Sequence, residues 1–141
     1  MSVIVNTTGF SSEDDTPEFI EFDALRASGA EHPVAVDLPN DIAITDVVPF
    51  FPWIKTIRIP FPNVADGRGF SLARRLRQAG YDGHLRAEGH LIVDQFPMAL
   101  QSGFDELEID DLLAARQPEH HWVRAANWQA GRYQTRLLKS A

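Results

Sequence analysis

The sequence contains no cysteine. Disulfide bonds, thiolate metal sites, iron–sulfur ligation and cysteine nucleophiles are therefore all excluded. Cysteine usage also leaves the redox compartment of the protein undetermined. Any redox chemistry would need a bound cofactor.

Long hydrophobic runs and an excess of positive charge are missing too. No apolar run approaches membrane-spanning length, and residues 1–5 carry no cationic lead of the kind found in signal and transit peptides. The formal net charge of −7 disfavours binding to bare nucleic acid, whose phosphates demand a positive surface. We expect a cytoplasmic protein that binds neither membranes nor nucleic acid.

The motifs of common cofactor and catalytic sites are also absent. There is no Walker sequence, no dinucleotide fingerprint and no Ser-His-Asp context. His120 and His121 are adjacent, whereas His84 and His90 stand apart, so the helical two-histidine spacing of many metal sites does not occur. The sequence predicts no metal site and no cofactor.

What is present is the composition of an ordinary globular chain. With 141 residues and 44% hydrophobic content, the chain has material for one core and too little for two. We therefore expect residues 1–141 to form one α/β domain. The mixture of polar and apolar residues in 1–30 predicts a peripheral arm or hairpin outside the core. Residues 119–141 form an aromatic tail that we expect to cover a sheet edge or an interface; it contains Trp122, Trp128 and Tyr133.

Between these segments, short apolar runs alternate with helical patterns. The expected strands cover residues 34–38, 56–59, 85–87 and 106–109, and the expected helices cover 42–51, 71–80, 95–102 and 112–116. The segment 42–51 has a strand as its alternative, because many of its residues are β-branched. Ser71 is the expected N-cap of its helix, and Gly80 and Gly103 are expected left-handed stops.

Strand and helix thus alternate about four times with short connections. This pattern is typical of right-handed β-α units and predicts a mainly parallel sheet, either half-barrel-like or layered as in flavodoxin. Parallel sheets need both faces covered and their edges protected. We therefore expect a homodimer, in which a second copy or the aromatic tail protects an edge.

In parallel α/β proteins, ligands bind beyond the carboxyl ends of the strands, where loops lead into helix N-termini. The rule selects side chains that follow the expected strands 56–59 and 85–87: Asp66, Arg68, Ser71, Glu88, Asp94 and Gln95. We expect these side chains to share one rim of the sheet. They are the candidate residues for ligand binding.

The segment 66–71 has two interpretations. In the first it is an anion cradle, in which glycines let the backbone approach and Ser71 and Arg68 bind an oxyanion. In the second it is a tight turn, in which Asp66 pairs with Arg68 or with backbone N–H groups. Arg74 follows on the helix as a further candidate for anion binding.

Arg86 lies inside a short apolar run, where an unpaired guanidinium would be very costly. It therefore needs a carboxylate partner, with Asp66, Asp94 and Glu88 as the candidates, or it contacts a ligand. Glu88 and Asp94 also have an acid–base interpretation, although spacing in the sequence does not determine how far apart they lie. These patterns assign no catalytic residue.

At several separated places the chain resembles the bacterial domain-of-unknown-function family nine-three-four: residues 66–74, Leu85-Arg86-Ala87, Asp94-Gln95 and Gly103-Phe104-Asp105. Members of that family are labelled as oxidoreductases of sulfite reduction, a label that rests largely on genes lying beside sulfite or nitrite reductase genes. The resemblance implies a small cytoplasmic accessory protein of assimilatory sulfur metabolism and no demonstrated reaction. The family often has an Arg-Cys pair before the Gly-Phe-Asp turn, where this chain has Gln101-Ser102, so a thiol role is excluded here.

Two functional hypotheses follow. The first is an accessory protein of assimilatory sulfite reduction that docks on a sulfite or nitrite reductase component or binds a small oxyanion. The alternative is a small α/β enzyme that binds an oxyanion or a phosphorylated metabolite at the carboxyl ends of the strands. A homodimeric scaffold is compatible with the first hypothesis.

Overall fold

The structure is a computed structural model that describes residues 2–12 and 17–127. The strands form a seven-stranded sheet in the order β2-β1-β7-β6-β5-β4-β3. They are β1 (Ser2–Asn6), β2 (Gly9–Ser12), β3 (Phe19–Glu21), β4 (Val34–Asp37), β5 (Ile54–Phe61), β6 (His84–Gly89) and β7 (Glu106–Asp110). The helices are α1 (Phe22–Ser28), α2 (Ile44–Val47), α3 (Arg68–Gln78), α4 (Phe96–Ser102) and α5 (Asp111–Arg116), with 3-10 helices η2 (Val48–Trp53) and η3 (Val93–Gln95). Residues 119–127 are also helical.

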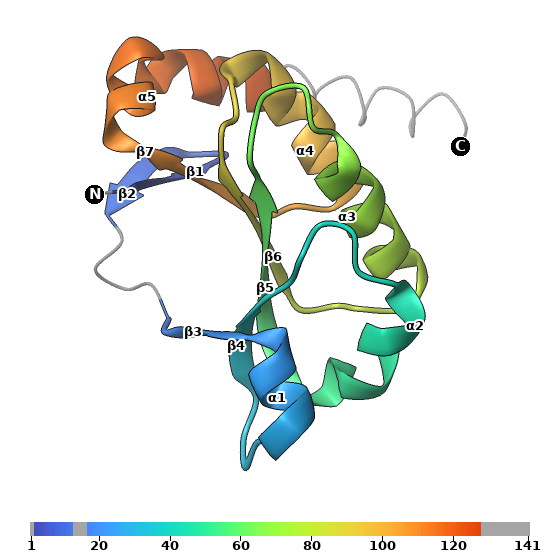
Figure 1. The fold of residues 1–141 in the computed structure, drawn as a ribbon. Coiled ribbons are helices and arrows are strands. Elements are labelled where there is room, and N and C mark those ends of the chain that lie inside the picture. The colour runs from blue at the N-terminus through green and yellow to red at the C-terminus, as the bar shows by residue number, and fades with distance from the viewer. Residues whose placement is uncertain (1, 13–16, 128–141) are drawn as a thin grey trace.

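Strands β3 to β7 pair in parallel, in the same order in space as in the sequence. Right-handed connections between strands in this order place the linking helices on one side of the sheet, and Figure 1 shows α2, α3 and α4 lying along one side of a curved sheet. The α/β class and the mainly parallel sheet are therefore confirmed. The order of the parallel strands in the sheet follows the sequence without a reversal, whereas a flavodoxin-like sheet has one. The sheet contains five parallel strands, and the predicted count of four β-α units is not confirmed.

The central strands carry different chemistry on their two sides, because successive side chains point to opposite faces. We call the helix-covered side the outer face; its fully buried residues include Ile57, Ile59, Leu85, Ala87 and Leu107. We call the opposite side the inner face; its ionisable residues include Asp37, Arg58, His84, Arg86, Glu88, Glu106 and Glu108. The hydrophobic core lies between the outer face and the helices, where it includes Leu72 and Leu76 of α3.

Turn residues end the helices largely where the sequence predicts. Gly80 and Gly103 have φ of 102° and 113°, which few other residues adopt, and they follow α3 and α4. Pro97 lies in the first turn of α4, where its missing N–H costs nothing. The segment 42–51 contains α2 and the start of η2, so its helical interpretation is confirmed and the strand alternative is wrong.

The predicted N-cap at Ser71 is wrong. Helix α3 begins at Arg68, with Gly67 at the N-cap position, so Ser71 is an exposed residue of the helix itself. The cause is Asp66, whose Oδ1 accepts a hydrogen bond from the backbone N–H of Arg68 at 3.1 Å. This Asx-type turn starts the helix three residues before Ser71.

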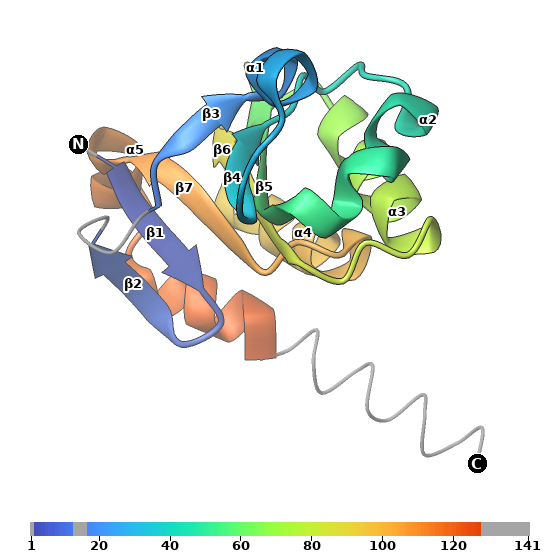
Figure 2. The same ribbon diagram turned by 90° about the horizontal axis from the view of Figure 1, so that it is seen from below.

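The segment 1–30 contributes to the core, which differs from the expectation of a peripheral arm. Hairpin β1–β2 joins the sheet because β1 pairs antiparallel with β7, with Val5 opposite Leu107. Phe22 and Leu25 of α1 are buried in the same core as Val5. Figure 2 shows this hairpin extending the sheet beyond β7, next to the helix at residues 119–127.

The described part of the predicted aromatic tail packs on α4. Trp122 is fully buried, its ring lies 5.6 Å from that of Phe96, and its Nε1–H donates to the Gln117 carbonyl at 2.9 Å. The other two aromatic residues of the tail, Trp128 and Tyr133, lie outside the described residues. None of the helices in the described ranges has the length and hydropathy of a transmembrane span.

Candidate functional site

The predicted rim contains a closed ion pair. Arg68 donates from Nε to Oδ1 of Asp66 at 3.0 Å and from Nη2 to Oδ2 at 2.7 Å, while Asn40 donates to Oδ2 at 3.3 Å. Hydrogen bonds from Arg68 hold the pKa of Asp66 at about 2. The Arg68 side chain remains 60% exposed. These contacts match the tight-turn interpretation, in which Asp66 pairs with Arg68 and with a backbone N–H group.

In the described part of the chain, none of the other rim candidates forms a hydrogen bond or an ion pair with the side chains of Asp66 and Arg68. Ser71 and Arg74 lie exposed on α3, and Asp94 lies exposed on η3. The side chain of Gln95 ties two loops together, because its Oε1 accepts from the Ile92 N–H at 3.0 Å and its Nε2 donates to the Val64 carbonyl at 3.0 Å. These contacts brace the loops that follow β5 and β6.

Arg86 is buried and paired, as its sequence position requires, but its predicted partners are wrong. Its side chain is 6% exposed. It donates from Nε and Nη2 to Oε1 of Glu106 at 2.8 Å and 2.6 Å, and from Nη1 to Oε1 of Glu108 at 3.0 Å. Both acceptors belong to β7, the neighbouring strand. The need for a carboxylate is thus confirmed, whereas none of the three predicted carboxylates supplies it.

The ion pairs continue across the sheet to β4. Arg58 binds Asp37 through two hydrogen bonds of 2.6 Å and 2.9 Å, and its Nη1 lies 3.2 Å from Oε1 of Glu108. The bidentate bond to Asp37 raises the pKa of Arg58. Strand register places Asp37, Arg58, Arg86 and Glu106 in one row across β4 to β7. Glu108 bridges the two arginines, which would otherwise repel each other as neighbours.

Phe19 covers the two guanidinium groups from the edge strand β3. Its ring centroid lies 4.0 Å from Cζ of Arg58 and 5.4 Å from Cζ of Arg86. Such cation–π contacts favour a partly desolvated guanidinium. Contacts from β3 to an arginine on β6 require a strongly curved sheet, with the inner face on its concave side.

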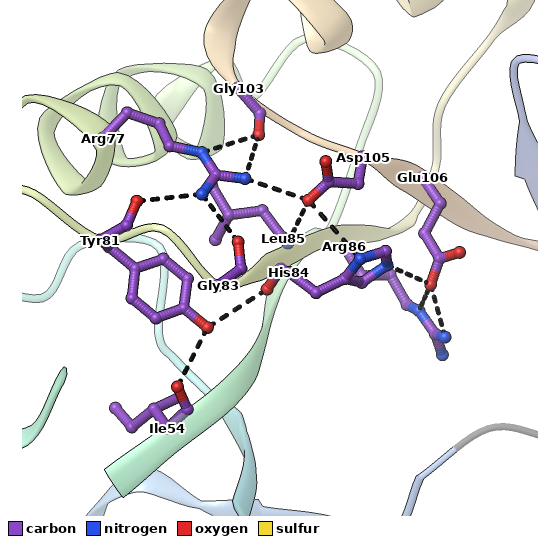
Figure 3. Close-up of polar contacts among 10 residues, drawn as sticks. All are labelled: Ile54, Arg77, Tyr81, Gly83, His84, Leu85, Arg86, Gly103, Asp105 and Glu106. Carbon is purple, nitrogen blue, oxygen red and sulfur yellow. Dashed lines mark hydrogen bonds and ion pairs between the residues drawn. The ribbon is translucent and has the colours of Figure 1, made fainter. Parts of the chain in front are cut away.

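A second cluster continues this network at the amino ends of the strands (Figure 3). His84 Nε2 lies 2.9 Å from Oε1 of Glu106, and Asp105 accepts from the Leu85 N–H at 2.8 Å and from Arg77 at 3.0 Å. Arg77 also donates to the carbonyls of Tyr81, Gly83 and Gly103, so it joins the end of α3 to β6 and β7. These bonds brace the fold at the end opposite to the predicted rim.

The protonation of this cluster is set by its hydrogen bonds. Burial would raise the pKa of Glu106, but the hydrogen bonds from His84 and Arg86 outweigh it and lower the pKa of that carboxyl. The same bond to Glu106 raises the pKa of His84. The network therefore favours an ionised Glu106 beside a protonated His84.

Glu88 differs from the other inner-face carboxylates. It is partly exposed, and its side chain makes no hydrogen bond and no ion pair within residues 2–12 and 17–127. Burial, followed by the charges of Glu108 and Asp37 and only partly offset by Arg58, raises the pKa of Glu88. This is the one predicted site residue whose side chain lies on the inner face without a bonded partner.

Sequence reasoning missed most of the inner-face network: Asp37, Arg58, His84, Glu106 and Glu108. A signal for it exists in the period-two alternation of Glu106-Leu107-Glu108-Ile109, which puts carboxylates on one face of a strand and apolar side chains on the other. Arg58-Ile59 and Arg86-Ala87 carry the complementary cations in neighbouring strands. Such alternation is unusual for a parallel sheet, whose strands are commonly apolar on both faces.

The fold and the inner face define an α/β protein whose parallel sheet has helices and an apolar core on one side and an ion-pair network on the other. The chain belongs to a family of bacterial proteins of unknown function, DUF934, whose model matches residues 35–140. No curated protein and no solved structure gives a significant match to this chain. The resemblance found in the sequence is thereby confirmed at the level of the family.

Proposed function

We propose that this protein is a cytoplasmic, non-catalytic accessory protein of assimilatory sulfite reduction, and that it acts by docking on a sulfite or nitrite reductase component. Membership of DUF934 supports the proposal, because the resemblance to that family implies an accessory protein of assimilatory sulfur metabolism. The acidic net charge of −7 favours a partner with a basic surface.

One observation separates docking from oxyanion binding. Arg68 and Arg86, the arginines best placed by sequence for an oxyanion, are both paired with carboxylates of the chain itself. An oxyanion bound to Arg68 would lie close to the carboxylate of Asp66, and one bound to Arg86 would lie beside the buried Glu106 and Glu108. Both positions bring an anion close to a carboxylate, which is electrostatically unfavourable.

Affinity purification of the tagged protein from its native host tests the docking proposal. Under conditions that preserve known complexes, we expect mass spectrometry to find a sulfite or nitrite reductase component at least tenfold enriched over an unrelated acidic protein with the same tag. Recovery of no such component would refute the proposal.

The alternative is a small enzyme that binds an oxyanion or a phosphorylated metabolite at the carboxyl ends of the strands. Its support is the exposed Arg68 at the start of α3, with Arg74 one turn and a half further along the helix. Thermal-shift measurements with sulfite, sulfate and phosphate would test it, with Arg68→Ala as the variant and the exposed Arg75→Ala as the matched control. Stabilisation by an anion that Arg68→Ala alone abolishes would favour this alternative over docking.

A homodimer is compatible with docking and is part of the same proposal. The parallel sheet ends at β3, a strand of only three residues, and a second copy would protect this edge. Light scattering at tens of micromolar protein measures the mass directly. A monomeric mass would remove the dimer from the proposal and leave docking in place.

A further inference from the structure

The carboxylate of Glu88 can accept hydrogen bonds, and no donor within the described residues supplies one. Glu88 is the penultimate residue of β6, and in register it lies between Pro60 of β5 and Glu108 of β7. Asp37, Glu106 and Glu108 each accept hydrogen bonds from an arginine, whereas Glu88 accepts none within the described ranges. A partly exposed carboxylate among neighbours that are all paired is an open acceptor position.

The charges of the inner face do not balance. Strand register places six carboxylates on this side: Asp37, Glu88, Glu106 and Glu108 around the two guanidinium groups, and Glu21 and Asp110 at the ends of β3 and β7. Against the two arginines this leaves four negative charges, or three when His84 beside Glu106 is protonated. The exposed His90 is the other basic side chain near Glu88. The inner face is therefore net negative and attracts a cation.

A nitrogen cation fits this position better than a metal ion. The oxygens of Asp37, Glu106 and Glu108 already accept from arginine, so these carboxylates cannot gather around a divalent ion without breaking their ion pairs. In the part of the chain that the structure describes, no group of three His, Asp or Glu side chains is arranged to hold a metal. A guanidinium or ammonium group needs only hydrogen-bond acceptors, which Glu88 offers.

We propose that the inner face binds one guanidinium or ammonium group, carried by a basic side chain of the docking partner, and that Glu88 is its acceptor. The inference rests on the proposed docking function and names the chemistry of the contact. Glu108 and Asp37 act at longer range as fixed negative charges. Arg58 and Arg86 hold those carboxylates in place, so the partner's cation meets an ordered site.

The first experiment tests the chemistry without the partner. N-acetylarginine amide and its neutral isostere N-acetylcitrulline amide are titrated into the full chain, and backbone amide shifts of β6 and β7 are followed by NMR. We expect the arginine compound to bind with a dissociation constant on the order of millimolar, and the citrulline compound at least about fivefold more weakly. Glu88→Gln should weaken the arginine compound to the citrulline level, whereas Glu31→Gln, an exposed loop control, should change nothing.

Equal binding of the two compounds, or unchanged binding to Glu88→Gln, would overturn the cation site. Absence of any shift in β6 and β7 with the arginine compound would overturn it as well.

The second experiment assigns the source of the cation. Tagged wild type, Glu88→Gln and Glu31→Gln are purified from the native host, and the co-purified reductase component is quantified. We expect Glu88→Gln to recover at least about tenfold less than the other two proteins, which corresponds to the loss of one charge-assisted contact. Equal recovery with Glu88→Gln would overturn the inference while leaving the docking function intact. A third result is that the arginine compound binds through Glu88 but the wild type recovers no reductase component. That result would refute the docking function and the assignment of the cation to a reductase, and it would leave the cation site at Glu88 supported.

Discussion

On strand β6, consecutive side chains enter two different environments. Leu85 and Ala87 point to the outer face and are fully buried against the helices, whereas Arg86 and Glu88 point to the inner face, among charges. Strands β5 and β7 repeat the contrast, with Ile57 and Leu107 on the outer face and Arg58 and Glu108 on the inner face. One set of strands therefore builds both an apolar core and an ionic surface.

The two faces contribute differently to folding. Burial of each large apolar side chain on the outer face stabilises the fold by about 1.5–3 kcal/mol. Buried ion pairs contribute little in net terms, because the loss of hydration offsets most of the attraction between the charges. The outer face therefore accounts for most of the stability, whereas the ion pairs of the inner face add little net stability. Binding is the role that we propose for the inner face.

The largest expected effect comes from breaking the inner network on one side only. Arg86→Met leaves Glu106 and Glu108 buried without their shared cation, and we expect a loss of about 3–5 kcal/mol in the free energy of unfolding. Urea denaturation measures this loss. The matched variant with Arg86→Met, Glu106→Leu and Glu108→Leu removes Arg86 together with both of its partners. Because Arg58 keeps its two hydrogen bonds to Asp37, the variant should lie within about 1 kcal/mol of wild type. A loss below about 1 kcal/mol for Arg86→Met alone would contradict the account of the network.

The outer face should respond to truncation in the ordinary way of a hydrophobic core. Leu85 is fully buried, so Leu85→Ala should cost about 3 kcal/mol through lost transfer energy and the cavity left behind. The same urea experiment measures the cost. Lys55→Ala, at an exposed position of β5, is the control and should change stability by less than about 0.5 kcal/mol. Equal effects at both positions would mean that the outer face is not the core.

Glu88→Gln should stabilise the protein, because Glu88 has no bonded partner and its pKa is raised by burial and by Glu108. The ionised form is therefore disfavoured in the folded state. This destabilisation is absent below the unfolded value near 4.5 and grows as the pH rises through the folded pKa. We expect a melting temperature about 2 °C above wild type at pH 7.5 and equal to wild type at pH 4. A lower melting temperature at pH 7.5 would indicate an internal partner for Glu88.

The smallest expected effect concerns His84. Its hydrogen bond to Glu106 raises its pKa, so protonation of His84 stabilises the fold below the unfolded value near 6.5, and this contribution is lost as the pH rises through the folded pKa. Because the side chain is 41% exposed, we expect His84→Gln to lower the melting temperature by only about 1 °C at pH 5.5 and not at pH 9. The exposed His32→Gln should show no difference at either pH. A loss that persists at pH 9 would show that packing, not charge, is responsible.

Local signals in the sequence predicted much of the parallel core. Pro33, Gly80 and Gly103 mark element ends by backbone geometry alone, and the structure confirms elements close to them. Ser71 failed as a cap because the side chain of Asp66 started the helix earlier. Both residue types can serve the same purpose, so composition did not decide between them.

Contacts between distant segments could not be predicted in this way. Val5 enters the core because β1 pairs with β7, about a hundred residues later, and no local pattern encodes that pairing. Arg86 required a carboxylate, but strand register selects which one, and register depends on the assembled sheet. The available signal was the alternation of charged and apolar residues in Glu106-Leu107-Glu108-Ile109. Its meaning depended on knowing that β6 and β7 are neighbours.

The most direct test of the account is whether the ion pairs of Arg86 on the inner face can be replaced by apolar side chains without loss of folding but with loss of docking. The variant with Arg86→Met, Glu106→Leu and Glu108→Leu and the wild type are tagged, purified from the native host and compared for the recovered reductase component. We predict a variant that unfolds at nearly the same urea concentration as wild type and recovers at least about tenfold less of the component. Equal recovery by the two proteins would contradict the claim that the inner face serves binding.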